Sequence, residues 1–257
     1  MSSVTGGERR GLLLALSIVA FIILCGLGAW QLQRLAWKQD LVATVESRID
    51  LPPVAAIGPS QWPTLDYDEV DYLPVTVTGT FDHDLEIHTY VVLEDPNGPE
   101  GGQGYFVMTP LTTEDGWVVI INRGFVPDAR KEADSRLAGQ IEGGVEVTGL
   151  LRQPQGRNAF TPPDDIAGNI WFTRDPAAIA TELGFQAELV APYYVDIIYD
   201  AGAVDGSPQG GETTVTFSNN HLQYVVTWFG LAAALAVIVF FRLRARAPED
   251  TEGTTAK

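Results

Sequence analysis

The stretch GLLLALSIVAFIILCGLGAW, residues 11–30, decides the fold of this chain. It carries no charged residue over about the 20 residues that a helix needs to cross a bilayer. A removable signal peptide usually has a shorter apolar core, about 7–15 residues, followed by a small-residue cleavage site. Here the run continues as Trp30-Gln31-Leu32-Gln33-Arg34 with a helical pattern. The sequence therefore favours an uncleaved membrane anchor.

A second apolar run, YVVTWFGLAAALAVIVFF, fills residues 224–241. We predict transmembrane helices over residues 11–32 and 223–241. Lys and Arg flank membrane spans on the cytoplasmic side. Such residues precede the first run and follow the second: Arg9, Arg10, Arg242, Arg244 and Arg246.

This charge pattern predicts how the chain is divided by the membrane. Residues 1–10 and 242–257 form a cytoplasmic N-terminus and a cytoplasmic tail, and residues 33–222 form an extracytoplasmic domain. The segment before the first span is too short, and too poor in Arg and Ser, for a mitochondrial transit peptide. We therefore expect a multi-pass protein of the bacterial inner membrane, with its central domain in the periplasm.

The composition of the central segment narrows its chemistry. The chain has a net charge of −17, and most of its acidic residues lie between the two spans. An acidic surface argues against nucleic acid and anionic headgroups as partners of this segment. The single cysteine, Cys25, lies in the first span. The central domain therefore has no disulfide, thiolate metal site or thiol redox motif.

Between the spans the pattern changes from helix to strand. The first helix should continue to about Asp50, before Leu51-Pro52-Pro53. Asp175, Pro176 and Gly184 have the residue types of a helix cap, a first turn and a helix end. Strands are predicted at residues 74–79, 85–93, 105–111, 117–122, 145–151 and 189–199. The fold class is thus a membrane protein with two transmembrane α-helices flanking a β-rich (α+β) extracytoplasmic domain, either a barrel or sandwich-like.

The central segment shows no convincing catalytic set. His83 and His88 would point to opposite faces of one strand. The acidic runs around residues 66–71 and 82–86 are typical of a solvated face. Arg123, at the end of the strand WVVIIN, is either a surface arginine or an anchor for an acidic group. Neither a nucleophile elbow nor a His-Glu-x-x-His motif is present, so the chain is not expected to be an enzyme.

The outer edge of the second span offers one candidate site. Ser218, Asn219 and Asn220 are good helix caps, which places His221 in or just before the first turn. The partial positive charge of a helix N-terminus favours a neutral imidazole, the form that binds metals. Helical spacing puts Tyr224 and Trp228 on the face of His221.

The first helix offers matching groups at a similar membrane depth. Trp30, Arg34 and Trp37 share one face by the same spacing. A histidine, an arginine and several aromatic rings suit a flat ligand with an iron centre and carboxylate tails, such as a heme. The same residue types also belong at membrane interfaces without any ligand, so the residues alone leave both interpretations open.

Three strings resemble the surfeit locus protein family of cytochrome c oxidase assembly factors. They are LGAWQLQRLAWK (residues 27–38), INRGFVP (121–127) and SNNHLQYVVTWFGLA (218–232). PYYVD (192–196) matches more loosely. Phe125 stands where the family often has Trp, and Val225 where it often has Ala.

The resemblance implies a non-enzymatic role in maturing the heme–copper centre of oxidase subunit I. Some bacterial members are thought to bind heme a through a histidine at the position of His221. We therefore predict His221 as an axial ligand of the heme iron, with Trp30, Arg34, Tyr224 and Trp228 around it. The expected partners are subunit I, the heme a synthesis machinery and membrane lipid, but not nucleic acid. The alternative is a membrane-anchored scaffold that stabilises an assembly intermediate without binding a cofactor.

Overall fold

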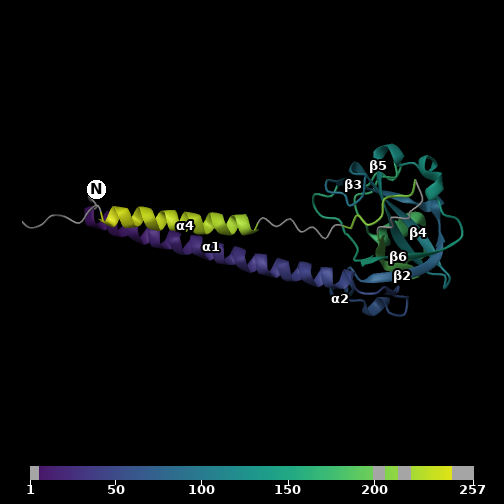
Figure 1. The fold of residues 1–257 in the computed structure, drawn as a ribbon, viewed down its shortest axis with the longest axis horizontal. Coiled ribbons are helices and arrows are strands. Elements are labelled where there is room, and N and C mark those ends of the chain that lie inside the picture. Colours follow the sequence, from purple (N-terminus) through teal and green to yellow (C-terminus); the bar gives the residue numbers. More distant parts are fainter. Residues whose placement is uncertain (1–5, 199–205, 214–220, 245–257) are drawn as a thin grey trace, which may run out of the picture. The chain divides into compact units, whose positions relative to one another are not determined.

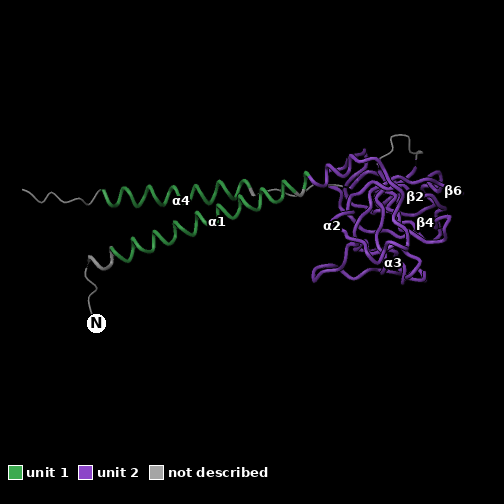
Figure 2. Tube along the Cα trace, turned by 90° about the horizontal axis from the view of Figure 1, so that it is seen from below, with its two compact units in different colours: residues 1–43, 216–257 green, residues 44–215 purple. Residues whose placement is uncertain are grey.

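The structure, a computed structural model, describes residues 6–198, 206–213 and 221–244. The chain divides into two compact units, coloured separately in Figure 2. The helical unit comprises residues 1–43 and 216–257, and the barrel unit comprises residues 44–215. Each unit is described by itself.

The helical unit consists of two long helices, α1 (Gly6–Ile49) and α4 (His221–Arg244), which lie side by side in Figure 1. The helix α1 ends at Ile49, so the predicted extension to about Asp50 is confirmed. Both helices are long and apolar enough to cross a membrane. Their large apolar side chains are exposed, for example Ile22 at 62% and Val226 at 68%. Such surfaces suit lipid rather than water.

The barrel unit is built on one seven-stranded sheet in the order β1-β2-β6-β7-β5-β4-β3. An additional pairing of β2 with β4 closes five of these strands into a ring. The six predicted strand segments are confirmed, and the domain is a barrel rather than a sandwich. The strands are β1 (Val54–Ala55), β2 (Pro74–Phe81), β3 (Ile87–Leu93), β4 (Gly102–Thr113), β5 (Val118–Pro127), β6 (Gly144–Arg152) and β7 (Val190–Ile197).

Short helices connect the strands. The predicted helix is α3 (Pro176–Leu183), where the Asp175 carboxylate accepts a hydrogen bond from Ala177 N–H at 3.0 Å. Gly184 ends it with a φ of 77°, a left-handed conformation that favours glycine. The remaining short helices are η1 (Trp62–Thr64), α2 (Tyr67–Val70), η2 (His83–Leu85), η3 (Asp128–Arg130), η4 (Ala133–Gly139) and η5 (Ala187–Leu189).

Successive residues of the ring strands point alternately into two different hydrophobic cores. Val119 and Ile121 of β5 and Tyr193 of β7 join one cluster, to which all five ring strands contribute, so this cluster fills the barrel. Ile120 and Tyr194 point the other way and pack with Ile179 of α3. This alternation is the period of two expected for strands covered on both faces.

Candidate functional site

The helical unit holds the residues that the sequence assigns to a heme. A Cβ atom on Gly28 of α1 would lie 2.8 Å from the Phe229 ring of α4, so the two helices are in close contact there. Val225 and Ala232 of α4 are also buried. Gly26 and Gly230 have no described atom within 4 Å of such a Cβ position. The contact at Gly28 fixes which residues of the antiparallel pair lie level.

Four of the predicted residues lie on the same side of the Gly28–Phe229 contact, within about 9 Å of it along the helix pair. Each helical residue rises about 1.5 Å. Arg34 is therefore about 9 Å along α1 from Gly28, and Tyr224 about 7.5 Å along α4 from Phe229 in the same direction. Trp30 and Trp228 lie nearer to the contact by the same measure.

Their side chains are open to the surroundings of the helices. Trp30 is 50% exposed and Tyr224 51% exposed, whereas Trp228 is half-buried. The Arg34 guanidinium lies 5.1 Å from the centre of the Trp37 ring. A cation over an aromatic ring is a surface on which a flat anionic ligand can lie.

His221 is the first residue of α4. It precedes Val225, Trp228 and Ala232 by four, seven and eleven residues, so its backbone position follows the helix face on which those residues are covered. Its side chain lies outside the described residues, as do the predicted caps at residues 218–220. Its predicted role as a ligand therefore stays a prediction.

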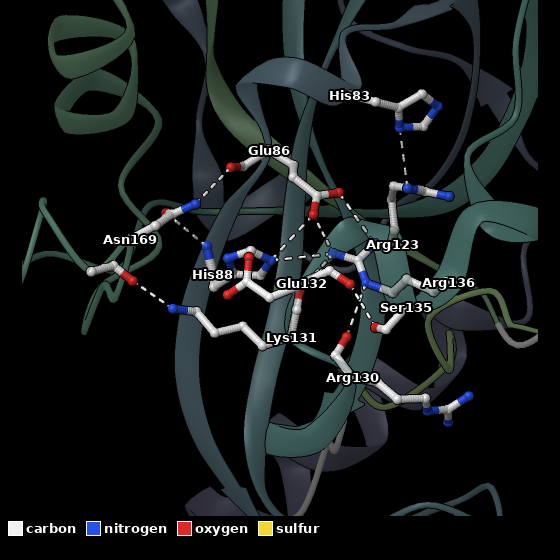
Figure 3. A network of polar contacts seen from close by, with 11 residues as sticks. His83, Glu86, His88, Arg123, Arg130, Lys131, Glu132, Ser135, Arg136 and Asn169 are labelled. Atoms are coloured by element: carbon white, nitrogen blue, oxygen red, sulfur yellow. Dashed lines mark hydrogen bonds and ion pairs between the residues drawn. The ribbon is translucent and has the colours of Figure 1, made fainter.

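The barrel unit contains a buried polar network that the sequence did not predict (Figure 3). Its centre is a two-pronged ion pair between Arg136 of η4 and Glu86, which precedes β3. Arg136 is 2% exposed and Glu86 8% exposed. His88 Nε2 lies 3.2 Å from Glu86 Oε1 and 3.2 Å from Arg136 Nη2, while none of the described residues forms a hydrogen bond with its Nδ1.

Arg123 adds a second buried guanidinium beside this pair. It donates to the Gly139 carbonyl and contacts His83 Nδ1 at 3.3 Å. Burial lowers the pKa of Arg123 to about 10, with Glu86 opposing and Arg136 adding to this shift. Arg123 is 4% exposed, so its interpretation as a surface arginine at a strand end is wrong: β5 continues past it to Pro127.

His83 and His88 contact different members of this network: His83 contacts Arg123, whereas His88 contacts Glu86 and Arg136. His83 lies in η2 rather than in a strand, so the argument from strand faces does not apply to it. Its Nδ1 faces the Arg123 donor and its Nε2 lies 2.9 Å from the Ile141 carbonyl. Arginine only donates and a carbonyl only accepts, so these contacts require the Nε2–H tautomer. Among the described residues, no group of three metal-binding side chains is present.

The Glu86 carboxyl makes the stability of the barrel unit depend on pH. Burial alone would raise its pKa, but hydrogen bonds from His88 and Arg136 and the charge of Arg136 lower it from 4.5 to about 2. Because the folded pKa is depressed, the stabilisation is present above pH 4.5 and is lost as the pH falls toward 2. We expect a loss on the order of 3 kcal/mol over this window. Denaturant unfolding of wild type and Glu86→Gln should show their difference shrinking over the same range, and a constant difference would contradict the assignment.

A second network joins two strings that are far apart in the sequence. The Asn122 amide donates to Asp196 Oδ1 at 2.7 Å, linking residues 121–127 to residues 192–196 through neighbouring strands β5 and β7. Asp196 also accepts from Arg152 at 3.1 Å, and Arg152 donates to Asp71 at 3.0 Å. The acidic runs therefore do not form only a solvated face, since Asp71 and Glu86 are buried.

A comparison with known protein families covers all of the segments described above. The model of the SURF1 family matches residues 18–233, which cover most of the chain. The chain belongs to the SURF1 family. This family consists of cytochrome c oxidase assembly factors that are generally non-enzymatic. The resemblance predicted from residues 27–38, 121–127 and 218–232 is confirmed.

Several relatives of this SURF1 family chain are eukaryotic proteins. Surfeit locus protein 1 of Homo sapiens is 37% identical over 239 residues, 89% of this chain and 75% of that protein. The Gallus gallus protein of the same name is 36% identical over 255 residues, 94% and 78% of the two chains. A SURF1-like protein of Monosiga brevicollis is 35% identical over 257 residues, 94% and 92% of the two chains.

Proposed function

We propose that this chain is a membrane-anchored assembly factor that holds heme a for insertion into subunit I of a cytochrome c oxidase. The proposal extends the family's role in oxidase assembly to a specific cofactor. The observation that carries it is the position of His221 as the first residue of α4, about 12 Å along the pair from the Gly28 contact and within about 5 Å of the heights of Arg34 and Tyr224.

The helical unit has groups that fit a heme. The N-terminal end of α4 disfavours a charged imidazole, so His221 would present a neutral nitrogen to the iron. Trp30, Tyr224 and the half-buried Trp228 would pack against a flat ring. Arg34 would pair with the carboxylate tails. When bound, heme a supplies redox and ligand-binding chemistry to the oxidase, and these residues only hold and orient it.

The proposed topology places this site at the outer boundary of the membrane. Residues 11–32 and 223–241 would span the bacterial inner membrane, residues 33–222 would lie in the periplasm, and residues 1–10 and 242–257 in the cytoplasm. The basic residues that flank both spans support this orientation. Subunit I and the heme a synthesis machinery would be the partners.

An absorption spectrum of the purified full chain tests the proposal. Protein made in cells that synthesise heme a should show a Soret band, and His221→Ala should lower the bound heme by at least about tenfold, since even residues behind a metal ligand change affinity by 10–100-fold. His83→Gln is the matched control, because glutamine keeps both a donor and an acceptor. Retention of full heme by His221→Ala would overturn the assignment.

A scaffold without a cofactor is the second candidate. Phe160 is 94% exposed in a loop held by hydrogen bonds, including one from Phe160 N–H to the Asn158 side chain at 2.8 Å. An ordered loop that exposes an aromatic ring is suited to contact with a partner protein. Colourless wild-type protein that still binds subunit I would favour this candidate over heme binding.

A further inference from the structure

The two membrane helices enclose a groove at the end of the pair that is distant from His221. Its volume is about 340 Å³. Both helices line it: α1 contributes residues from its N-terminal half, and α4 contributes residues from its last turns. The lining residues are Leu13, Leu14, Ser17, Leu235, Ile238, Val239, Arg242 and Leu243.

This groove is apolar along its length and basic at one end. The Ser17 hydroxyl already donates to the Leu13 carbonyl at 2.8 Å, so it requires no ligand. Arg242 is the charged residue of the lining, and none of the described carboxylates forms an ion pair with it. The sequence adds Arg9 and Arg10 before the first span and Arg244 after Arg242. An apolar groove that ends at a guanidinium complements an aliphatic chain attached to an anion.

We propose that this groove binds an anionic phospholipid, with one acyl chain between α1 and α4 and its phosphate on Arg242. A guanidinium binds phosphate through two parallel hydrogen bonds. Basic pockets between membrane helices on the cytoplasmic side are typical sites for anionic headgroups. The strongly acidic central domain is not expected to attract such lipids.

A lipid fits this groove better than a helix of a partner protein does. A helix with its side chains is about 10–12 Å in diameter, so it would lie across the groove rather than enter it. Helix contacts in membranes also favour small residues, whereas leucine, isoleucine and valine dominate this lining. The lipid proposal rests on the proposed membrane location but not on heme binding.

Binding of defined lipids to the full chain tests the site. The purified protein would be placed in phosphatidylcholine nanodiscs, with phosphatidylglycerol of the same acyl chains added to a matched set. We expect native mass spectrometry to show one retained phosphatidylglycerol and a higher thermal midpoint than in phosphatidylcholine alone. Arg242→Gln should weaken this retention at least about fivefold. Ser17→Phe, which fills the groove, should also reduce it.

Arg244→Gln is the matched control, because it removes an equal charge two residues away from a side chain that does not line the groove. Equal loss in Arg242→Gln and Arg244→Gln would overturn the site in favour of a diffuse basic surface. Equal retention of both lipids would overturn the phosphate contact. Both leaflets of a nanodisc have the same composition, so the outcome does not depend on orientation. The Soret band of Arg242→Gln reports on the heme proposal separately.

Discussion

Gly124→Ala is expected to lower the free energy of unfolding of the barrel unit by about 3 kcal/mol or more. Gly124 has a φ of 122°, a conformation that residues with a Cβ atom rarely adopt. A Cβ atom there would lie 2.1 Å from the Gln209 carbonyl oxygen. The obstacle is backbone, so a change of side-chain rotamer cannot relieve it.

A clash at Gly124 matters because the next residue, Phe125, connects Gln209 to the barrel through two backbone hydrogen bonds. Phe125 N–H donates to the Gln209 carbonyl, and Gln209 N–H donates to the Phe125 carbonyl, both at 2.8 Å. Urea denaturation of the full chain in detergent, followed by the fluorescence of its buried tryptophans, would measure the loss. Gly144→Ala is the control, because nothing lies within 4 Å of its Cβ position, and its effect should stay within about 0.5 kcal/mol. Similar stability of the two variants would contradict the role of Gly124.

Glu86→Gln is expected to destabilise the barrel unit by about 3–5 kcal/mol at neutral pH. The substitution preserves the shape of the side chain but removes the carboxylate that faces Arg136 and lies near Arg123. Two buried guanidiniums would then have no negative partner in this network. Removing one member of a buried ion pair is costly because the remaining charge cannot regain its hydration.

An exposed ion pair of the same unit provides the comparison. Arg130 and Glu100 are in contact at 2.8 Å, with side chains 32% and 40% exposed. Glu100→Gln should therefore cost less than about 1 kcal/mol, because water screens this pair. The double variant Glu86→Leu with Arg136→Met should recover part of the loss. If the two single variants unfold at the same urea concentration, the buried network does not stabilise the fold.

The sequence predicted elements whose signals are local. Residues 11–30 identify a span by their length and polarity, and Asp175 and Gly184 mark the two ends of α3 within ten residues of each other. The alternation of residues 74–79 identifies β2 in the same way. Each of these signals lies in neighbouring residues, so no knowledge of the rest of the chain is needed.

Long-range pairings could not be predicted in this way. Arg136 and Glu86 are separated by 50 residues. The residues around Arg136 do not indicate that Glu86 is its partner, and the residues around Glu86 do not indicate Arg136. The closure of the barrel by β2 and β4 is similarly distant. Arg123 could be recognised as unusual by its place in a resembling string, but its burial depends on η4, which covers it. For the residues that we propose hold heme, the spacing along each helix predicted only which side chains share a helix face.

The place of β7 in the sheet has a consequence for biogenesis. It is the last strand among the described residues, yet it lies between β5 and β6, so the ring cannot close until residue 197 has been synthesised. At about 5–20 residues per second, the edges of β5 and β6 that face β7 stay unpaired for several seconds. During this interval the nascent domain is exposed to aggregation. Closure of the barrel thus comes only shortly before the synthesis of α4, which begins at His221.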